Sequence, residues 1–312
     1  MKNPTLQFSG QTPLGSYICL ALAMLLTGVY VALCKPLGAA MPVFLLALLR
    51  FSMAALTVPH WLLPTHDAQP LSSRTWRLLF LQSFFGNFIF TICMIYGLQM
   101  TTALSAGIIL ACIPASIAIL GVVFLREKIA PKMLTSIALG VGGLVLLASA
   151  TREDAGASGS KPWLGNLLIL TSVFCEAAYV IIGKKLSDSI SPRRVAALIN
   201  ACGLALFMLP GLYQAYDFDF GCITPWLGLL LAFYALTASV ICVWLWMTGL
   251  RNVPATQSGI FTVLMPVGAV LTGVIFLGEN LSGMHLVALT LALSGLVLAT
   301  WRPMQADAIA AQ

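Results

Sequence analysis

The sequence predicts an all-α polytopic membrane protein with ten transmembrane helices, arranged as two inverted five-helix repeats. Three observations support this fold class: a shortage of charge, ten long apolar runs and an internal duplication. Of the 312 residues, 60% are hydrophobic and 8% are charged, whereas a soluble domain contains roughly 25% charged residues. Because so few polar groups cannot cover a surface that faces water, soluble, coiled-coil and disordered folds are excluded.

A membrane-spanning helix needs about 20 consecutive, mostly apolar residues. Ten stretches between polar, proline or glycine breaks fit this length: 14–34, 43–63, 75–98, 103–125, 132–150, 163–183, 194–213, 224–249, 255–277 and 283–301. The polar segment 151–162 lies at the midpoint and links a first unit, 14–150, to a second unit, 163–301. Because the other loops are short, we expect no separate soluble domain.

Lysine and arginine are distributed unequally over the predicted loops. If the N-terminus is cytoplasmic, only Lys35, Arg152 and Lys161 lie in outside loops, and nearly all other basic residues lie inside. The positive-inside rule therefore predicts that both termini are cytoplasmic. The net charge of +6 reflects this bias, so we expect the lipid bilayer, and no nucleic acid, as a partner.

The two halves of the chain match when one is shifted along the other. A shift of 152 residues brings glycines, prolines and glutamates into register: Gly97 falls on Gly249, Pro114 on Pro266 and Glu127 on Glu279. Register kept over several hydrophobic helices indicates an internal duplication. Because each unit has an odd number of spans, the second unit enters the membrane from the opposite side. Such inverted repeats are typical of secondary transporters.

Motifs at matching places in the two units resemble those of a known family. They are residues 96–98 (YGL), 103–114 (ALSAGIILACIP) and 124–127 (FLRE) in the first unit, and 249–266 and 276–279 (FLGE) in the second. Over about 14–301, this pattern is similar to the drug/metabolite transporter superfamily, specifically its EamA-type permeases. The resemblance implies a multi-pass carrier of the bacterial inner membrane, often an exporter, for amino acids, their derivatives, other metabolites or drugs.

Two ionisable residues lie well inside predicted spans, Arg50 in 43–63 and Glu176 in 163–183. Charges inside a membrane are costly and therefore indicate function. Helical spacing places Glu176 and Tyr179 on one face. An apolar wall disfavours a carboxylate, which suits Glu176 to proton exchange. We expect Glu176 and Tyr179 to bind substrate and Glu176 to couple protons; the alternative is a neutral or arginine-paired structural glutamate.

Arg50 is expected to bind an anionic group of the substrate, such as a carboxylate, with its fork of donors. The alternative is a structural arginine held by helix-end carbonyls or by a carboxylate. Further candidates for substrate binding are Asn87, its shifted counterpart Ser239, and Trp246. Aromatic walls suit an amphipathic substrate through stacking and cation–π contacts, although such aromatics also serve as ordinary packing.

Pro114 and Pro266 fall within predicted spans, where a proline removes a backbone hydrogen bond and kinks the helix. We expect them to act as hinges, the alternative being static kinks. Glu127 is expected to stabilise the start of the following helix. Small residues repeat on the fifth helix of each unit and allow close packing, and a homodimer through helices five and ten is one arrangement they permit: Ser136 and Gly140, and Ala288 and Ala292.

The sequence contains no metal-ligand spacing, nucleotide-binding motif or cluster of catalytic groups, so we expect no cofactor, no metal and no enzymatic activity. The expected function is export of a small amphipathic metabolite, such as an amino acid, by alternating access, with proton coupling through Glu176. The alternatives are a non-transporting membrane sensor or assembly subunit and, less favoured, an intramembrane lipid-modifying enzyme.

Overall fold

A computed structural model describes residues 13–33, 35–63, 71–100, 109–150, 162–187, 189–277 and 283–300, and every regular element in these ranges is helical. The first half contains α1 (Pro13–Leu33), α2 (Lys35–Ala40), α3 (Val43–Thr57), η1 (Pro59–Trp61), α4 (Ser73–Ser83), η2 (Phe84–Ile89), α5 (Phe90–Met100), α7 (Ile113–Leu125) and α8 (Pro131–Ala150). The second half contains α9 (Pro162–Ser187), α10 (Pro192–Tyr216), η3 (Phe220–Cys222), α11 (Pro225–Tyr234), η4 (Ala235–Ile241), α12 (Cys242–Asn252), α13 (Ala255–Ser258), η5 (Gly259–Val263), α14 (Leu264–Leu277) and α15 (Gly283–Thr300).

The helices begin where the sequence supplies start signals. Prolines occupy the first position of α8, α9, α10 and α11, where the missing N–H of proline costs no hydrogen bond. Ser72 caps α4, its hydroxyl accepting from the Thr75 amide at 3.2 Å, and Thr224 caps α11, accepting from Leu227 at 3.3 Å. Ser72 and Thr224 are 152 residues apart, so the two halves start this helix with the same device.

Six helical stretches among the described residues are long and apolar enough to cross a membrane: Leu14–Val31, Ser73–Gly97, Trp163–Ser187, Pro192–Tyr216, Pro225–Asn252 and Ala255–Thr272. Four shorter apolar helices lie where the remaining four spans were predicted: Val43–Thr57, Ile113–Leu125, Pro131–Leu146 and Leu286–Thr300. The fold is therefore that of an all-helical, membrane-embedded, multi-pass protein.

Several spans differ in detail from the prediction. The helix expected over 43–63 ends at Thr57, because the proline at 59 disfavours helical backbone at the preceding residue. The span expected over 255–277 is divided into α13, the 3₁₀ segment η5 and α14. Residues 103–108 of the fourth expected span lie outside the described residues, and α7 begins after a turn at Ala111 and Cys112.

The third span of each half contains a π-helical segment. η2 follows α4 in the first half, and η4 follows α11 in the second, so that both interrupt their spans at corresponding places. A π-helix is rare and is often found at functional sites. Here the two segments carry Asn87 and Ser239, which the sequence had singled out as candidates.

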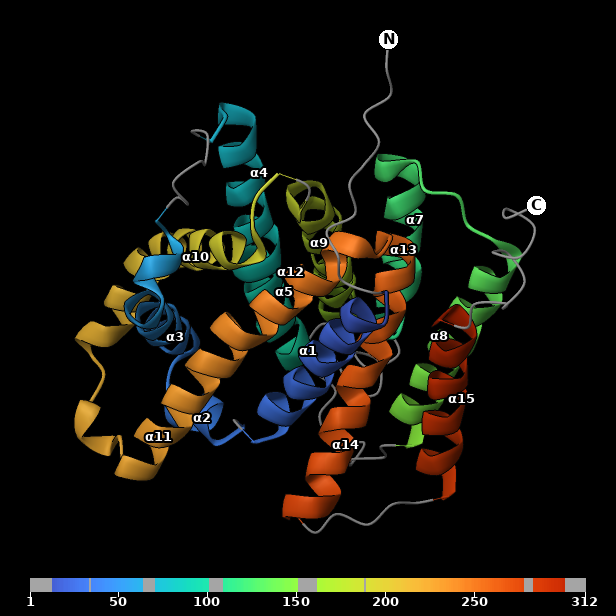
Figure 1. Ribbon diagram of the computed structural model, residues 1–312. Helices are drawn as coiled ribbons and strands as arrows, with labels where there is room; N and C mark the ends of the chain where they lie inside the picture. The colour runs from blue at the N-terminus through green and yellow to red at the C-terminus, as the bar shows by residue number, and fades with distance from the viewer. Residues whose placement is uncertain are drawn as a thin grey trace.

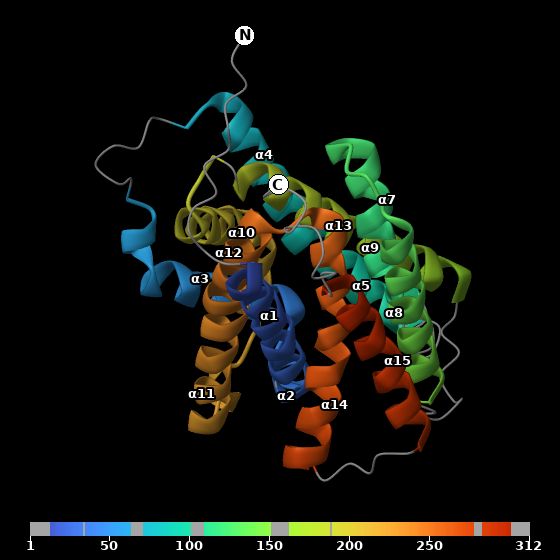
Figure 2. The same cartoon turned by 45° about the vertical axis from the view of Figure 1, so that its right-hand side comes forward.

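The helices pack across the boundary between the halves. α1 packs against α12 and α14, whereas α9 packs against α5 and α7. α3 pairs with α10 on one side of the molecule, and α8 pairs with α15 on the opposite side (Figures 1 and 2). Because α1 belongs to the first half and its partners to the second, while α9 has the reverse arrangement, neither half forms a closed bundle alone.

Small residues set the spacing of the α8–α15 pair. A Cβ atom at Gly143 would lie 2.7 Å from the Ala288 carbonyl oxygen, and one at Gly295 would lie 2.6 Å from the Ser136 carbonyl oxygen. Such close approach is typical of helix pairs in membranes, where small residues let backbones meet. The small-residue faces of the fifth and tenth helices therefore contact each other within one chain, and a homodimer through these helices stays a prediction.

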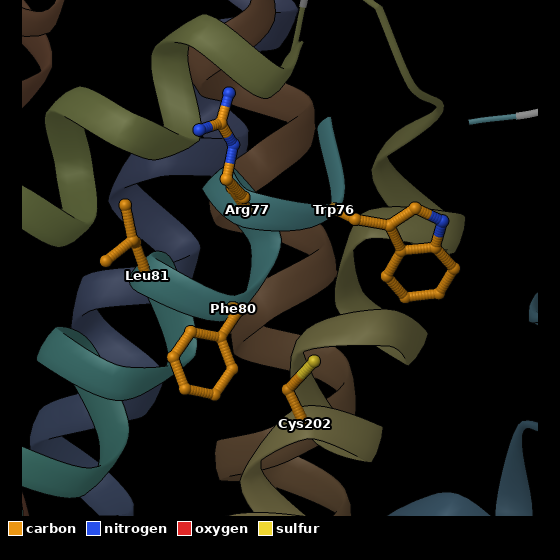
Figure 3. A pocket seen from close by; sticks show the side chains of 5 residues that line it. All are labelled: Trp76, Arg77, Phe80, Leu81 and Cys202. Carbon is orange, nitrogen blue, oxygen red and sulfur yellow. The ribbon is translucent and has the colours of Figure 1, made fainter. Parts of the chain in front are cut away.

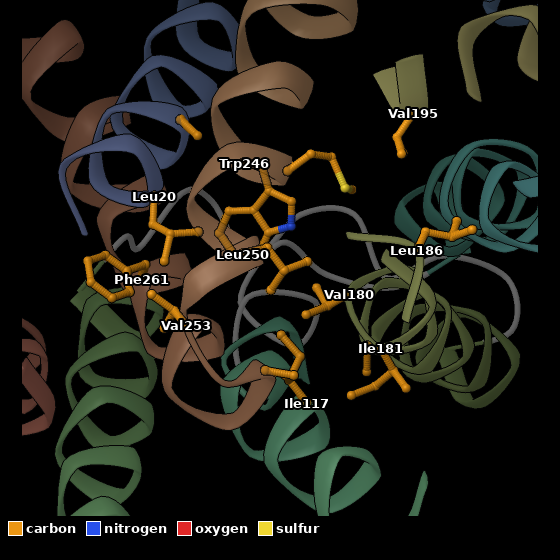
Figure 4. Close-up of a cluster of buried hydrophobic side chains, with 14 of the residues drawn as sticks. Leu20, Ile117, Val180, Ile181, Leu186, Val195, Trp246, Leu250, Val253 and Phe261 are labelled. Carbon is orange, nitrogen blue, oxygen red and sulfur yellow. The ribbon is translucent and has the colours of Figure 1, made fainter. Parts of the chain in front are cut away.

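The largest hydrophobic cluster lies where α1, α7, α9 and α12 meet (Figure 4). Its buried members include Leu20, Ile117, Val180, Trp246 and Leu250. This cluster therefore packs helices of the two halves against each other.

Candidate functional site

Arg50 projects from α3 into a group of aromatic rings. Its Nη1 donates a hydrogen bond to the Tyr234 hydroxyl at 3.2 Å. Its guanidinium carbon lies 4.3 Å from the centre of the Phe51 ring and 5.4 Å from that of Tyr234, distances at which cation–π attraction contributes. The buried Nε atom has no hydrogen-bond partner among the described residues. Arg50 is thus held by Tyr234 and Phe51, and its Nε donor is unused among the described residues.

Two further tyrosines enclose this group. The Tyr30 ring of α1 lies 5.5 Å from the Tyr234 ring and tilted by 58° to it. Tyr179, on α9, lies within electrostatic range of both Arg50 and Glu176. Tyrosines from α1, α9 and α11 therefore surround one arginine from α3, and the four helices come from both halves of the chain.

Tyr179 rests directly on the backbone of η2. A Cβ atom at Gly86 would lie 2.7 Å from Cγ of Tyr179 and closer still to its Cδ2, so only glycine leaves room for the ring. The Tyr179 carbonyl oxygen accepts a hydrogen bond from Gln82 Nε2 at 3.3 Å. The first π-helical segment and the end of α4 thus fix the position of Tyr179.

Glu176 lies one helical turn before Tyr179 on α9. Among the described residues, none donates a hydrogen bond to its carboxyl group, and it forms no ion pair with Arg50, whose Nη1 is bound to Tyr234. The structure therefore does not contain the Arg50–Glu176 ion pair that the sequence left open as an alternative. Arg50 and Glu176 both lie near Tyr179 and do not pair with each other.

The remaining sequence candidates occupy two kinds of place. Asn87 Nδ2 donates to Ser83 Oγ at 3.1 Å within the first π-helical region. Ser239 is 2% exposed and its hydroxyl has no partner among the described residues. Trp246 is 3% exposed and lies in the main hydrophobic cluster, with its indole N–H also unpartnered among the described residues. Asn87 and Ser239 thus belong to the π segments, whereas Trp246 belongs to the packing around them.

Sequence reasoning missed two polar residues close to this group. Gln82 is fully buried, and its Oε1 has no partner among the described residues. Tyr30 had no signal of its own in a helix rich in apolar residues. Gln82 did have one, because the shift of 152 residues relates it to Tyr234, which is also a polar residue in a predicted span.

Pro114 and Pro266 do not interrupt continuous α-helices, contrary to expectation. Pro114 is the second residue of α7, and Pro266 is the third residue of α14. In the first turn of a helix the proline nitrogen has no α-helical acceptor to lose, so the predicted loss of an internal hydrogen bond does not occur. The changes of helix type lie just before each proline, at Ala111–Cys112 and at η5.

Glu127 also differs from expectation, because it caps a helix in the other half of the chain and does not cap the following helix. Its two carboxylate oxygens accept hydrogen bonds from the amides of Ala255 and Thr256, both at 2.8 Å, at the start of α13. Arg126, with a φ of 56°, ends α7 in the left-handed region and turns the chain back. The corresponding residue Glu279 lies outside the described residues.

The chain has apolar helices long enough to span a membrane, and α1 and α9 each pack against the opposite half. A buried polar group lies between the two halves. These features define a polytopic membrane protein. The model of the EamA-like transporter family matches the chain twice, over residues 14–149 and 163–301. The chain therefore belongs to the EamA-like transporter family.

Relatives with curated descriptions agree with this assignment. The protein YetK of Bacillus subtilis (strain 168), described as an uncharacterized transporter, is 33% identical over 95% of this chain and 89% of its own length. An uncharacterized transporter of Archaeoglobus fulgidus is 24% identical over 70% of this chain and 74% of its own. A protein of known crystal structure has the same fold, with a TM-score of 0.76 over 93% of this chain and 97% of that one, at 18% identity.

Proposed function

We propose that this protein is a secondary transporter that exports small amphipathic metabolites, such as amino acids or their derivatives, across a bacterial inner membrane. The observation that carries the proposal is the unpaired arrangement of Arg50 and Glu176 around Tyr179. A zwitterionic compound has one anionic and one cationic group, which suit Arg50 and Glu176 respectively. Its apolar part would contact the rings of Tyr30, Tyr179 and Tyr234.

Alternating access between two inverted five-helix repeats is the mechanism that we propose. Three features of the fold support it: matched caps at Ser72 and Thr224, matched π segments η2 and η4, and the exchanged packing of α1 and α9. Two equivalent halves can exchange conformations and so expose a shared site to each side in turn. Bending at Pro114 and Pro266, where α7 and α14 begin, would provide the hinges.

Proton coupling through Glu176 is the second part of the proposal. The Glu176 carboxyl group receives no hydrogen bond from the described residues and lies on an apolar helix. Such a group is suited to binding and releasing a proton during each cycle. Export would then exchange substrate for protons, with both termini of the protein in the cytoplasm.

Efflux from proteoliposomes tests the proposal. Vesicles loaded with a mixture of isotopically labelled amino acids should release at least one of them faster than empty-membrane controls, and an imposed pH gradient should change the rate. Arg50→Ala should abolish this efflux, and Glu176→Gln should leave it independent of pH. Arg74→Gln, at an exposed position at the start of α4, is the matched control. Wild-type rates for Arg50→Ala would refute the assignment of the site.

A further inference from the structure

A pocket outside the polar group lies on the surface formed by α4 and α10. Its volume is about 530 Å³, and it is lined by Trp76, Arg77, Phe80, Leu81 and Cys202. Figure 3 shows the first four side chains projecting from α4 and Cys202 facing Phe80 from α10. The volume falls within the range of about 300–1,000 Å³ typical of small-molecule sites.

This pocket lies on two helical stretches that can cross a membrane. Ser73–Gly97 and Pro192–Tyr216, which include its two walls, are both long and apolar enough to span a bilayer. Trp76 is 48% exposed and Phe80 47% exposed, so about half of each side chain is left uncovered by the described chain. An apolar, concave surface at membrane depth contacts acyl chains because no water is present there to fill it.

Arg77 is the one charged side chain in the lining. Figure 3 shows that it points away from Phe80 and Cys202. Its side chain is exposed, and it forms no hydrogen bond or ion pair with the other described residues. Arg77 and Trp76 lie near the start of α4, as is typical of residues at the membrane–water interface. A guanidinium in this position can bind a phosphate with two parallel hydrogen bonds.

We propose that the pocket between α4 and α10 binds one acidic phospholipid. One acyl chain lies against Phe80, Leu81 and Cys202, and Arg77 binds the headgroup phosphate. Arg74, one turn earlier and also exposed, adds a second positive charge, so an anionic headgroup is preferred over a zwitterionic one that carries its own cation. This site does not depend on the proposed function, because neither Arg50 nor Glu176 contributes to it.

The size of the pocket argues against a second copy of the chain as its occupant. A stable interface between proteins buries about 20–30 residues on each side, whereas five side chains line this pocket. A single phospholipid, by contrast, has elongated acyl chains, one of which matches the apolar wall, and one phosphate, which matches the arginine at its end.

Native mass spectrometry of the purified protein in detergent tests the proposal with two probes, palmitoyl-oleoyl phosphatidylglycerol and the phosphatidylcholine with the same chains. The wild type should retain one phosphatidylglycerol more tightly than phosphatidylcholine. Arg77→Gln should weaken phosphatidylglycerol binding about fivefold, the factor expected for one arginine at a membrane surface. It should weaken phosphatidylcholine binding less, because the choline cation already offsets the charge of that lipid's phosphate. Arg74→Gln, outside the pocket lining, is the matched control and should have a smaller effect.

Fluorescence provides a second readout that does not depend on charge. Phosphatidylglycerol with brominated acyl chains should quench the wild type more than Trp76→Phe, because Trp76 lines the pocket. Cys202→Phe fills the floor of the pocket and should remove this difference. Any of three results would overturn the proposal. The wild type could retain the two lipids equally, Arg77→Gln and Arg74→Gln could have equal effects, or quenching could be unchanged by Cys202→Phe. A change of oligomeric state in Cys202→Phe without loss of lipid would instead indicate a protein contact and overturn it too.

Discussion

Replacing Gly86 by alanine tests how closely the first π-helical segment packs against Tyr179. The new Cβ atom would lie 2.7 Å from Cγ and 2.9 Å from Cβ of Tyr179, so the ring or the helix must move. Overpacking of this kind costs about 1–3 kcal/mol, against a gain of up to about 1 kcal/mol for alanine over glycine in a helix. We therefore expect Gly86→Ala to lower the free energy of unfolding by up to about 2 kcal/mol.

A double-mutant cycle separates these two contributions. With Tyr179→Ala as background, the obstructing ring is gone, and Gly86→Ala should become neutral or stabilising. The coupling energy between the two positions should then be about 1–3 kcal/mol. SDS-induced unfolding in mixed micelles, followed by circular dichroism, measures the four free energies.

Gly142→Ala is the matched control for this cycle. Gly142 lies in α8, and a Cβ atom there would meet no other atom within 4 Å, so the substitution reports helix propensity alone. A coupling energy of zero, with Gly86→Ala as stabilising as Gly142→Ala, would refute the reasoning that Tyr179 rests on η2. Because Tyr179 lies near both Arg50 and Glu176, the same displacement is expected to slow efflux in the proteoliposome assay.

Three further substitutions have defined outcomes in thermal unfolding of the detergent-solubilised protein. Glu127→Ala leaves two amides of α13 without their carboxylate, and since bonds to charged groups contribute about 1.5–3 kcal/mol each, the midpoint should fall by several degrees; an unchanged midpoint would contradict the capping role. Tyr234→Phe removes the hydroxyl that binds Arg50 and should cost about 0.5–1.5 kcal/mol, whereas Tyr213→Phe, at a residue 80% exposed, should have no effect. Gly143→Leu should separate α8 from α15 and lower the midpoint more than Gly142→Leu on the open side of the same helix, and equal effects would argue against the close contact.

Much of the fold could be predicted from the sequence. The apolar runs and their polar breaks located most apolar helices of the described chain within a few residues. The exceptions are α3, which a proline ended early, α7, which begins only at Ile113, and the span that is divided into α13, η5 and α14. Family membership was also predictable, because the repeated motifs around Pro114 and Pro266 survive in both halves. The π segments could not be predicted, because a widened helical turn leaves no sequence periodicity that distinguishes it from an α-helix.

The candidate site was predicted in part. Arg50 and Glu176 could be found because charge inside an apolar span is rare and costly. That they do not pair, and that Tyr30 and Tyr234 join Arg50, required the tertiary structure, since these residues come from helices that are distant along the chain. The place of Glu127 was misjudged for the same reason, because the amides that it caps belong to the other half of the chain. Pro114 and Pro266 were misplaced within their helices, because the sequence does not show that α7 and α14 begin only one or two residues before them.

The sequence by itself determined the class of protein and the positions of its apolar helices, because a bilayer demands a continuous apolar helix from each spanning segment separately. It also revealed the duplication, because the two halves carry the same motifs in register. Only the tertiary structure decided which helices meet. Inside a membrane, helices are selected by close contact between small residues and by a few polar bonds, such as those of Gly143 and Glu127. Those contacts depend on shape across the whole bundle, and they bring Arg50, Tyr179 and Glu176 to one place.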